Sequence, residues 1–376
     1  MKPVAEQIRA EIGRDGAISF ARFMDLALYC PNYGYYEQKT DTVGKRGDFY
    51  TSVSVGPLFG ELLAFQFAEW LEAEVGSQKS EVSIVEAGAH DGRLAKDILS
   101  WLKLRRPALF ERLEYRILEP SAQRQEWQRE TLQEFLPHIH WQPALTHHAS
   151  RITGIIFSNE LLDAIPVHRL GWDAKEHEWF EWGVTIQGDR FDWCRLPNSI
   201  HATRNTQHAA ATGNQPSAIL ALPPDLLAAL PDGFTTEICP AAETWWRGAA
   251  QMLERGKLLT IDYGLNAEEF FVPQRANGTL RAYHRHQVSD DVLANPGEQD
   301  LTAHVNFTAI QQAGEAAGLK TESLCTQAQF LTQIGARAWS AEGVFGPWTP
   351  EHGRQFQTLT HPQHLGRAFR VLVQSR

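Results

Sequence analysis

The chain has 376 residues, of which 43% are hydrophobic, and this is enough apolar material for a large folded core. Its formal net charge of −10 argues against nucleic-acid phosphates or anionic membranes as the main partners. The four cysteines are far apart and form no CxxC pair, so neither a metal site nor a disulfide framework is expected. No apolar leader and no stretch long enough for membrane insertion is visible. We therefore expect a soluble, cytoplasmic protein.

Hydrophobic spacing predicts a series of alternating helices and strands. Two amphipathic helices are expected within residues 3–30, and residues 33–51 are typical of an ordered loop rich in glycine and aromatic residues. Residues 57–75 form a strongly apolar helix that must be buried. Further along the chain, strands are expected at 82–86, 115–118, 138–142, 154–157 and 257–264, helices at 121–135 and 243–254, and closing strands within 319–330 and at 369–373.

This alternation predicts an α/β fold with a doubly wound, mostly parallel sheet. The pattern changes after residue 167, where alternating, tryptophan-rich segments up to residue 196 predict antiparallel hairpins. Residues 198–218 are the least structured part of the sequence. We expect N-terminal helices and loop over residues 1–75 to pack on a domain over 76–376, with an insertion at about 167–235 that is a candidate partner or substrate surface.

The most informative motif leads from a strand through a glycine turn into a helix. Glu86 ends the strand, and Gly88 and Gly92 open the backbone after it. A second acid, Glu119, follows the next strand, as in nucleoside-binding βαβ units whose second acid accepts hydrogen bonds from ribose hydroxyls. Because the carboxyl ends of parallel strands meet at one edge, four polar groups are expected to line one crevice: Glu86-Ala87-Gly88, Glu119, Ser158-Asn159-Glu160 and Asp262-Tyr263-Gly264.

The spacing of the glycines bears on which cofactor binds. A dinucleotide fingerprint, G-x-G-x-x-G, needs glycines where this chain has His90 and Arg93, so a nicotinamide-dependent oxidoreductase loses support. The methyltransferase pattern, acid-x-G-x-G-x-G, is met from Glu86 to Gly92 except at His90. The motif by itself leaves an unrelated nucleotide or a purely structural turn open.

Taken together, the motifs resemble the MidA-like family of class I S-adenosylmethionine-dependent methyltransferases, which includes a mitochondrial complex I assembly factor that methylates an arginine. The matching segments occur in the family's order at residues 18–24, 34–36, 47–51, 59–61, 86–94, 159–167, 261–264, 278–283 and 300–307. The departure is His90, which replaces a usual glycine. The resemblance implies a Rossmann-like fold, S-adenosylmethionine as the cofactor, and a protein substrate, with an arginine of a complex I subunit as a candidate acceptor.

Candidate site residues follow from the motif and the resemblance together. For cofactor binding they are Glu86, Gly88, His90, Gly92, Glu119 and Asn159, and the resemblance adds Asp48 and Tyr50 from the N-terminal loop. A guanidinium is protonated at neutral pH, so its methylation needs carboxylates that localise the charge and take up the proton. The candidate catalytic residues are Glu160, Asp163 and Asn159, and the two acids share a face if Asn159 begins a helical turn.

A structural role remains open for each of these residues. Asn159, Glu160 and Asp163 fit a helix cap or a first-turn acid, Glu119 fits a solvated strand end, and Asp48 with Tyr50 fits an ordered turn. His304 fits either a base or a structural histidine. We expect a protein arginine methyltransferase, and the alternative is an assembly or interaction protein that keeps the fold without catalysis, which His90 favours.

Overall fold

The computed structural model describes residues 3–38, 51–75, 81–145, 151–197, 222–284 and 287–376. The chain divides into two compact units, each assembled from three stretches. The sheet unit comprises Thr42–Leu162, Trp245–Gly264 and Gln311–Arg376, and the hairpin unit comprises Met1–Asp41, Asp163–Thr244 and Leu265–Ile310. The division at residue 76 expected from the sequence stays a prediction.

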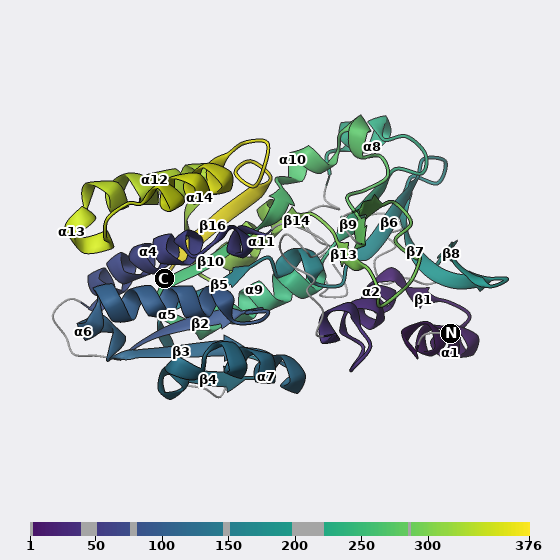
Figure 1. Cartoon of the computed structure of the whole chain (residues 1–376). Coiled ribbons are helices and arrows are strands. Elements are labelled where there is room, and N and C mark those ends of the chain that lie inside the picture. The colour runs from purple at the N-terminus through teal and green to yellow at the C-terminus, as the bar shows by residue number, and fades with distance from the viewer. Residues whose placement is uncertain (1–2, 39–50, 76–80, 146–150, 198–221, 285–286) are drawn as a thin grey trace. The chain divides into compact units, whose positions relative to one another are not determined.

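The central sheet of the sheet unit runs in the order β15-β16-β10-β5-β2-β3-β4 (Figure 1). Its strands are β2 (Val82–Ala87), β3 (Leu113–Leu118), β4 (Ile139–Gln142), β5 (Ile152–Asn159), β10 (Leu253–Leu265), β15 (Lys320–Thr326) and β16 (Phe369–Ser375). The pairs β2–β3, β3–β4, β2–β5 and β5–β10 are parallel, whereas β16 is antiparallel to both β10 and β15. The predicted doubly wound, mostly parallel α/β sheet is therefore confirmed.

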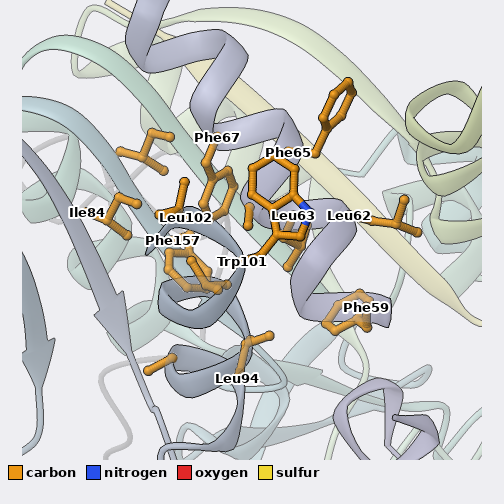
Figure 2. Close-up of a cluster of buried hydrophobic side chains, with 14 of the residues drawn as sticks. Phe59, Leu62, Leu63, Phe65, Phe67, Ile84, Leu94, Trp101, Leu102 and Phe157 are labelled. Atoms are coloured by element: carbon orange, nitrogen blue, oxygen red, sulfur yellow. The ribbon is translucent and has the colours of Figure 1, made fainter. Parts of the chain in front are cut away.

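Helices cover this sheet and bury its apolar strands. They are α3 (Ser52–Val55), α4 (Leu58–Val75), α5 (Arg93–Arg105), α6 (Pro107–Phe110), α7 (Ala122–Thr131), η2 (Gln133–His138), α9 (Pro240–Met252), α11 (Phe307–Ala316), α12 (Gln327–Ser340), α13 (Glu342–Phe345) and α14 (Pro350–Thr360). The apolar helix predicted over residues 57–75 is α4, which packs on α5 and β5 (Figure 2). The Phe67 ring lies 5.1 Å from that of Phe157 on β5, and Phe65 meets Trp101 of α5 edge-on at 5.9 Å. Each such buried ring contributes about 1.5–3 kcal/mol.

Two elements end earlier than the sequence predicts. The helix expected over 121–135 stops at Thr131 and gives way to a 3-10 helix that contains Pro137, a residue without an N–H for an α-helical bond. The strand expected within 319–330 stops at Thr326, because this residue caps α12. Its hydroxyl accepts the N–H of Gln329 at 3.3 Å, and the Gln329 side chain accepts the N–H of Thr326 at 3.0 Å.

The hairpin unit contains the predicted antiparallel hairpins. Its main sheet has the order β1-β7-β6-β9, with β8 beside β7, and its strands are β1 (Ile18–Ser19), β6 (His168–Asp173), β7 (Glu178–Gln187), β8 (Arg190–Arg195) and β9 (Thr235–Ile238). A second sheet has the order β12-β11-β13, formed by Gln287–Ser289, Arg281–His284 and Asp300–Thr302. Trp172 and Trp179 are buried against each other, with ring centroids 5.2 Å apart, as part of a small core.

The helices of the hairpin unit are short, apart from the two that the sequence predicted within residues 3–30. They are α1 (Pro3–Asp15), α2 (Phe20–Tyr29), η1 (Tyr35–Glu37), α8 (Pro224–Ala229), α10 (Ala267–Phe270) and η6 (Pro273–Arg275), and the short strand β14 (Val305–Asn306) leads into α11. Among all residues that the structure describes, no helix combines the length and the apolar character that crossing a bilayer requires. Residues 198–218 lie outside the described ranges.

Candidate functional site

The turn after β2 takes the backbone through the left-handed region three times. Gly88 has φ 75°, His90 has φ 48° and Gly92, which precedes α5, has φ 84°. At Gly88 a side chain would also be crowded, since a Cβ there would lie 2.9 Å from Leu161 Cδ1. The His90 imidazole is 41% exposed and lies 3.8 Å from Asp91 Oδ1, so it does not fill the turn. The two glycines therefore serve the backbone geometry that the motif predicted.

Glu86, near the end of β2, is a buried carboxyl group with one strong donor. Its side chain accepts a 2.6 Å hydrogen bond at Oε2 from the Tyr115 hydroxyl. Burial raises the pKa of Glu86 to about 7, and repulsion from Asp91 adds to this effect, although the Tyr115 hydrogen bond opposes it. A carboxyl group with this pKa changes charge near neutrality, and a nearby cation would favour its ionised form.

Glu119 follows β3 and is as deeply buried as Glu86, but it has several donors. Its Oε1 accepts the N–H of Ser121 at 2.9 Å and pairs with Arg124 at 2.8 Å. Its Oε2 accepts Nε2 of Gln128 at 3.1 Å, and the same amide group donates to the His90 carbonyl at 3.0 Å. Gln128 thus joins the end of β3 to the turn after β2, a role that sequence reasoning missed because nothing in the α7 pattern marks it.

The turn after β5 is built differently, because a glutamate adopts the left-handed conformation. Glu160 has φ 51°, and its N–H donates to the Ile261 carbonyl at 2.9 Å. Its Oε1 accepts the N–H of Ser52 at 3.3 Å and Nδ2 of Asn159 at 3.1 Å. The other amide atom of Asn159, Oδ1, is buried without a hydrogen-bond partner in the described part of the chain. An unpaired buried acceptor at a strand end is a position where a ligand donor fits.

Asp262 on β10 holds this turn in place. Its fully buried carboxylate accepts the N–H groups of Leu161 at 3.1 Å and Leu162 at 2.7 Å through Oδ2, and that of Tyr263 at 2.8 Å through Oδ1. The strand-end motif drew attention to this residue, but its role in supporting the turn at Glu160 was not predicted. Asp262 lies inside β10, one residue beyond the pair of Ile261 with Asn159, and only this pairing of β10 with β5 places it beside the turn.

The helical turn that would have placed Glu160 and Asp163 on one face does not begin at Asn159. Asn159 closes β5, Glu160 has left-handed backbone, and the helical residues that follow are a 3-10 turn over Leu162–Ala164. No helix therefore places Glu160 and Asp163 on one shared face. Their joint role in catalysis stays a prediction.

Asp163 begins the second stretch of the hairpin unit, where its side chain is buried. Its backbone carbonyl accepts the Ala303 N–H at 3.0 Å. Burial is the main cause that raises the pKa of Tyr36, followed by the charge of Asp300, and the charge of Asp163 adds to the shift. The Tyr36 hydroxyl donates to Asp300 Oδ1 at 2.7 Å. Asp163 thus belongs to a buried group of acids and tyrosines.

Three further candidates complete the predicted set. Asp48 and Tyr50 lie outside the described residues. His304 is largely buried, and burial, followed by repulsion from Arg275 and Arg281, lowers its pKa to about 4, so its imidazole is neutral at physiological pH. An imidazole with this pKa is a weak base near neutral pH, and its Nδ1 is buried without a hydrogen-bond partner among the described residues, so both alternatives for His304 stay open.

The chemistry of the strand ends identifies the kind of cofactor that fits. The acids at this edge of the sheet are Glu86, Glu119, Glu160 and Asp262, all within the sheet unit. Glu86 and Glu160 suit a cation, Glu119 suits hydroxyl donors, and the unpaired Asn159 Oδ1 adds another acceptor, whereas a pyrophosphate would meet acids here. S-adenosylmethionine has a sulfonium, an ammonium and ribose hydroxyls, so these residues fit it.

Comparisons with known proteins agree with this assignment. A family model described as "Putative S-adenosyl-L-methionine-dependent methyltransferase" matches residues 62–325. A superfamily member from Burkholderia thailandensis, crystallised with S-adenosyl-homocysteine, is 32% identical, with a TM-score of 0.81 over 99% of this chain and 92% of that one. The resemblance, the class I methyltransferase fold and the cofactor predicted from the sequence are thereby confirmed.

Two curated relatives correct one expectation. The Drosophila melanogaster protein named protein arginine methyltransferase NDUFAF7 homolog, mitochondrial, is 28% identical over 98% of this chain and 84% of its own length. The Homo sapiens protein arginine methyltransferase NDUFAF7, mitochondrial, is 26% identical over 89% of this chain and 73% of its own length. The expected cytoplasmic location is wrong by this comparison, because both relatives are named as mitochondrial. Since the family model spans well over half of its residues, the chain belongs to this family of S-adenosylmethionine-dependent methyltransferases.

Proposed function

We propose that the chain transfers the methyl group of S-adenosylmethionine to an arginine side chain of a protein, with a respiratory complex I subunit as the candidate substrate. The names of the fly and human relatives support arginine as the acceptor. The observation that carries the proposal most directly is the carboxyl-rich strand edge with the constrained acid Glu160, because a guanidinium acceptor needs negative charge beside it.

The cofactor supplies a methyl group on a sulfonium, and the residues of the chain hold and orient it. Glu86 would face the cationic methionine end, and Glu119 would accept hydrogen bonds from the ribose hydroxyls by sharing or replacing its present donors. Asn159 would offer its unpaired Oδ1. The turn formed by Gly88, His90 and Gly92 would let the backbone approach the cofactor, and the family resemblance adds Asp48 and Tyr50.

Glu160 and Asp163 would act on the acceptor. A carboxylate beside the guanidinium localises its positive charge and takes up the proton that leaves with methylation. Glu160 suits this role because its left-handed backbone and the hydrogen bonds of its Oε1 with the Ser52 N–H and the Asn159 amide fix the direction of its carboxylate. General-base assistance of this kind contributes about 10²–10⁴-fold to a rate.

The test is transfer of labelled methyl groups from S-adenosylmethionine to proteins of a lysate, followed by mass spectrometry of the labelled peptides. We expect label on arginine. Label on lysine, on a free amino acid or on a small molecule would refute the proposed acceptor, while the family assignment would stand.

A non-catalytic assembly protein is the second candidate, and His90 is the observation that favours it. A non-glycine residue in the left-handed region of the cofactor turn costs about 1–2 kcal/mol and is unusual where backbone must approach a ligand. This alternative predicts cofactor binding by calorimetry without transfer of label to any protein. A His90→Gly variant separates the two, because only an enzyme would show a change in turnover.

A further inference from the structure

A small cavity in the sheet unit lies apart from the strand ends. It has a volume of about 160 Å³, and its walls come from the start of α4, the exposed side of α5, and the segment that joins α13 to α14. Its lining includes the side chains of Glu61, Asp97, Ser100, Trp101 and His352. None of them belongs to the predicted cofactor or catalytic set.

Two acids, Glu61 and Asp97, line this cavity together with Arg105 and His352. Burial raises the pKa of Asp97 to about 6, and repulsion from Glu61 is the next cause. Burial also raises the pKa of Glu61. Among the described residues, none donates a hydrogen bond to Asp97 or forms an ion pair with it. Two partly buried carboxyl groups that repel each other are stabilised when a cation binds between them.

The neighbouring cations compensate only part of this charge. His352 Nε2 lies 3.6 Å from Glu61 Oε2, and its Nδ1 accepts the Thr349 N–H at 3.4 Å, so the proton of a neutral imidazole points toward Glu61. The Arg105 guanidinium packs on Gly346, and a side chain at position 346 would clash with it. Arg105 also lowers the pKa of Glu61, but less than His352 does. Neither group acts on Asp97, whose pKa Lys96 and Arg93 lower instead, by less than burial and Glu61 raise it.

The shape and the walls of the cavity favour a flat cation. Trp101 lines the cavity beside Phe345, with ring centroids 5.8 Å apart, and its Nε1 is already bonded to the Phe345 carbonyl at 3.2 Å. The rings therefore line the cavity with apolar atoms, and the Arg106 guanidinium already lies over the Trp101 ring, 5.5 Å from its centroid. At roughly 30 Å³ for each water molecule, the cavity has room for about five waters. A guanidinium with a short part of its alkyl stem needs a similar volume.

We propose that this cavity binds an alkylguanidinium group, the head group of an arginine side chain or of a small guanidine, between Glu61 and Asp97 and against Trp101. A guanidinium donates through two edges and stacks on aromatic rings, whereas an ammonium is a compact, strongly hydrated charge that does neither as well. The site is independent of the proposed catalytic function, since it uses none of the residues at the strand ends.

The experiment titrates the full chain with n-propylguanidinium and, separately, with n-butylammonium, and follows each probe by saturation-transfer NMR. We expect n-propylguanidinium to bind at least about five-fold more tightly than n-butylammonium. The variants Asp97→Asn and Ser100→Leu should each weaken its binding at least about five-fold, the first by removing charge and the second by filling the cavity. The matched control is Glu322→Gln, a carboxylate on β15 that pairs with Lys257 and is not part of the cavity lining.

Two further measurements control for folding and for cofactor binding. Thermal unfolding confirms that each variant is folded, and calorimetry with S-adenosylmethionine reports on the cofactor site independently. A capped Gly-Arg-Gly peptide that binds as well as n-propylguanidinium identifies a protein side chain as the ligand, and binding of the small guanidine alone identifies a free metabolite. Absence of binding, equal binding of the ammonium, or binding unchanged in Asp97→Asn and Ser100→Leu overturns the proposal.

Discussion

The turn after β2 and the turn after β5 both take the chain through left-handed backbone, but they use different residues to do so. In the first turn, Gly88 and Gly92 adopt that conformation at no steric cost, with His90 between them. In the second turn, Glu160 adopts it with a full side chain, and the carboxylate of Asp262 accepts three neighbouring N–H groups to hold the turn. Glycine allows the left-handed conformation in the first turn, whereas hydrogen bonds to the buried Asp262 carboxylate hold the second turn in place.

This difference suggests different purposes. A turn of glycines leaves room for a ligand to approach the backbone, which suits cofactor binding. A strained glutamate persists only when its surroundings determine it, and such positions are common at reacting groups. The two turns also touch, because a Cβ at Gly88 would meet Leu161 of the second turn.

The largest expected effect is on catalysis at the second turn. Glu160→Gln should lower methyl transfer at least about 100-fold, because the amide cannot take up the proton of the acceptor. Cofactor affinity and stability should change little, since glutamine has the same shape and the same backbone strain. Initial rates of label transfer and calorimetry measure both quantities, with Glu322→Gln as the control. Retained transfer would show that Glu160 only supports the turn.

The support of the second turn is tested by Asp262→Ala. Removing the carboxylate leaves three N–H groups without their acceptor, so the free energy of unfolding should fall by about 2–4 kcal/mol. Urea unfolding at neutral pH measures this loss. A loss below about 1 kcal/mol would mean that the bond from Glu160 N–H to Ile261 holds the turn by itself.

The contact between the two turns is tested by a double-mutant cycle with Gly88→Ala and Leu161→Ala. Gly88→Ala should cost about 1–2 kcal/mol from its φ alone, and more from the clash with Leu161. The second substitution should recover part of the clash, so the pair should be less destabilising than the sum by about 0.5–1 kcal/mol. Strict additivity would argue against a contact between the turns.

The control for this cycle is Gly248→Ala in α9. A Cβ at Gly248 would meet no atom within 4 Å, and its backbone is helical. This substitution should therefore stabilise the chain, by up to about 1 kcal/mol.

The smallest expected effect concerns the proton on Glu86 in the first turn. With a pKa of about 7, this carboxyl is largely protonated at pH 6.5, and a sulfonium beside it would favour ionisation. Cofactor binding should then release roughly half a proton at pH 6.5. Calorimetry in buffers of different ionisation enthalpy measures this release, and Glu86→Gln should abolish it. An unchanged release in the variant would assign the proton to another group.

The same carboxyl makes stability depend on pH. Its folded pKa lies above the unfolded value of 4.5, so the folded chain binds more protons between these values. This contribution to stability is complete below pH 4.5 and is lost as the pH rises through about 7.

The sequence by itself determined the alternating α/β pattern, the apolar strand that ends at Glu86, and the glycine turn after it, because these features rest on local periodicity and on the backbone freedom of glycine. It also placed Glu86 and Glu119 at strand ends, since strand ends are local too, whereas Asp262, expected at a strand end, lies inside β10. The insertion of hairpins after residue 167 was readable for the same reason.

Only the tertiary structure decided which of these acids are paired and how. The strain at Glu160, its support by Asp262 from the neighbouring strand β10, and the link from Gln128 to His90 all join residues from separate elements. The two acids of the cavity, Glu61 and Asp97, meet through the packing of α4 on α5. Hydrogen bonds and charge repulsion between such residues depend on distances in space, and no local pattern in the chain records them.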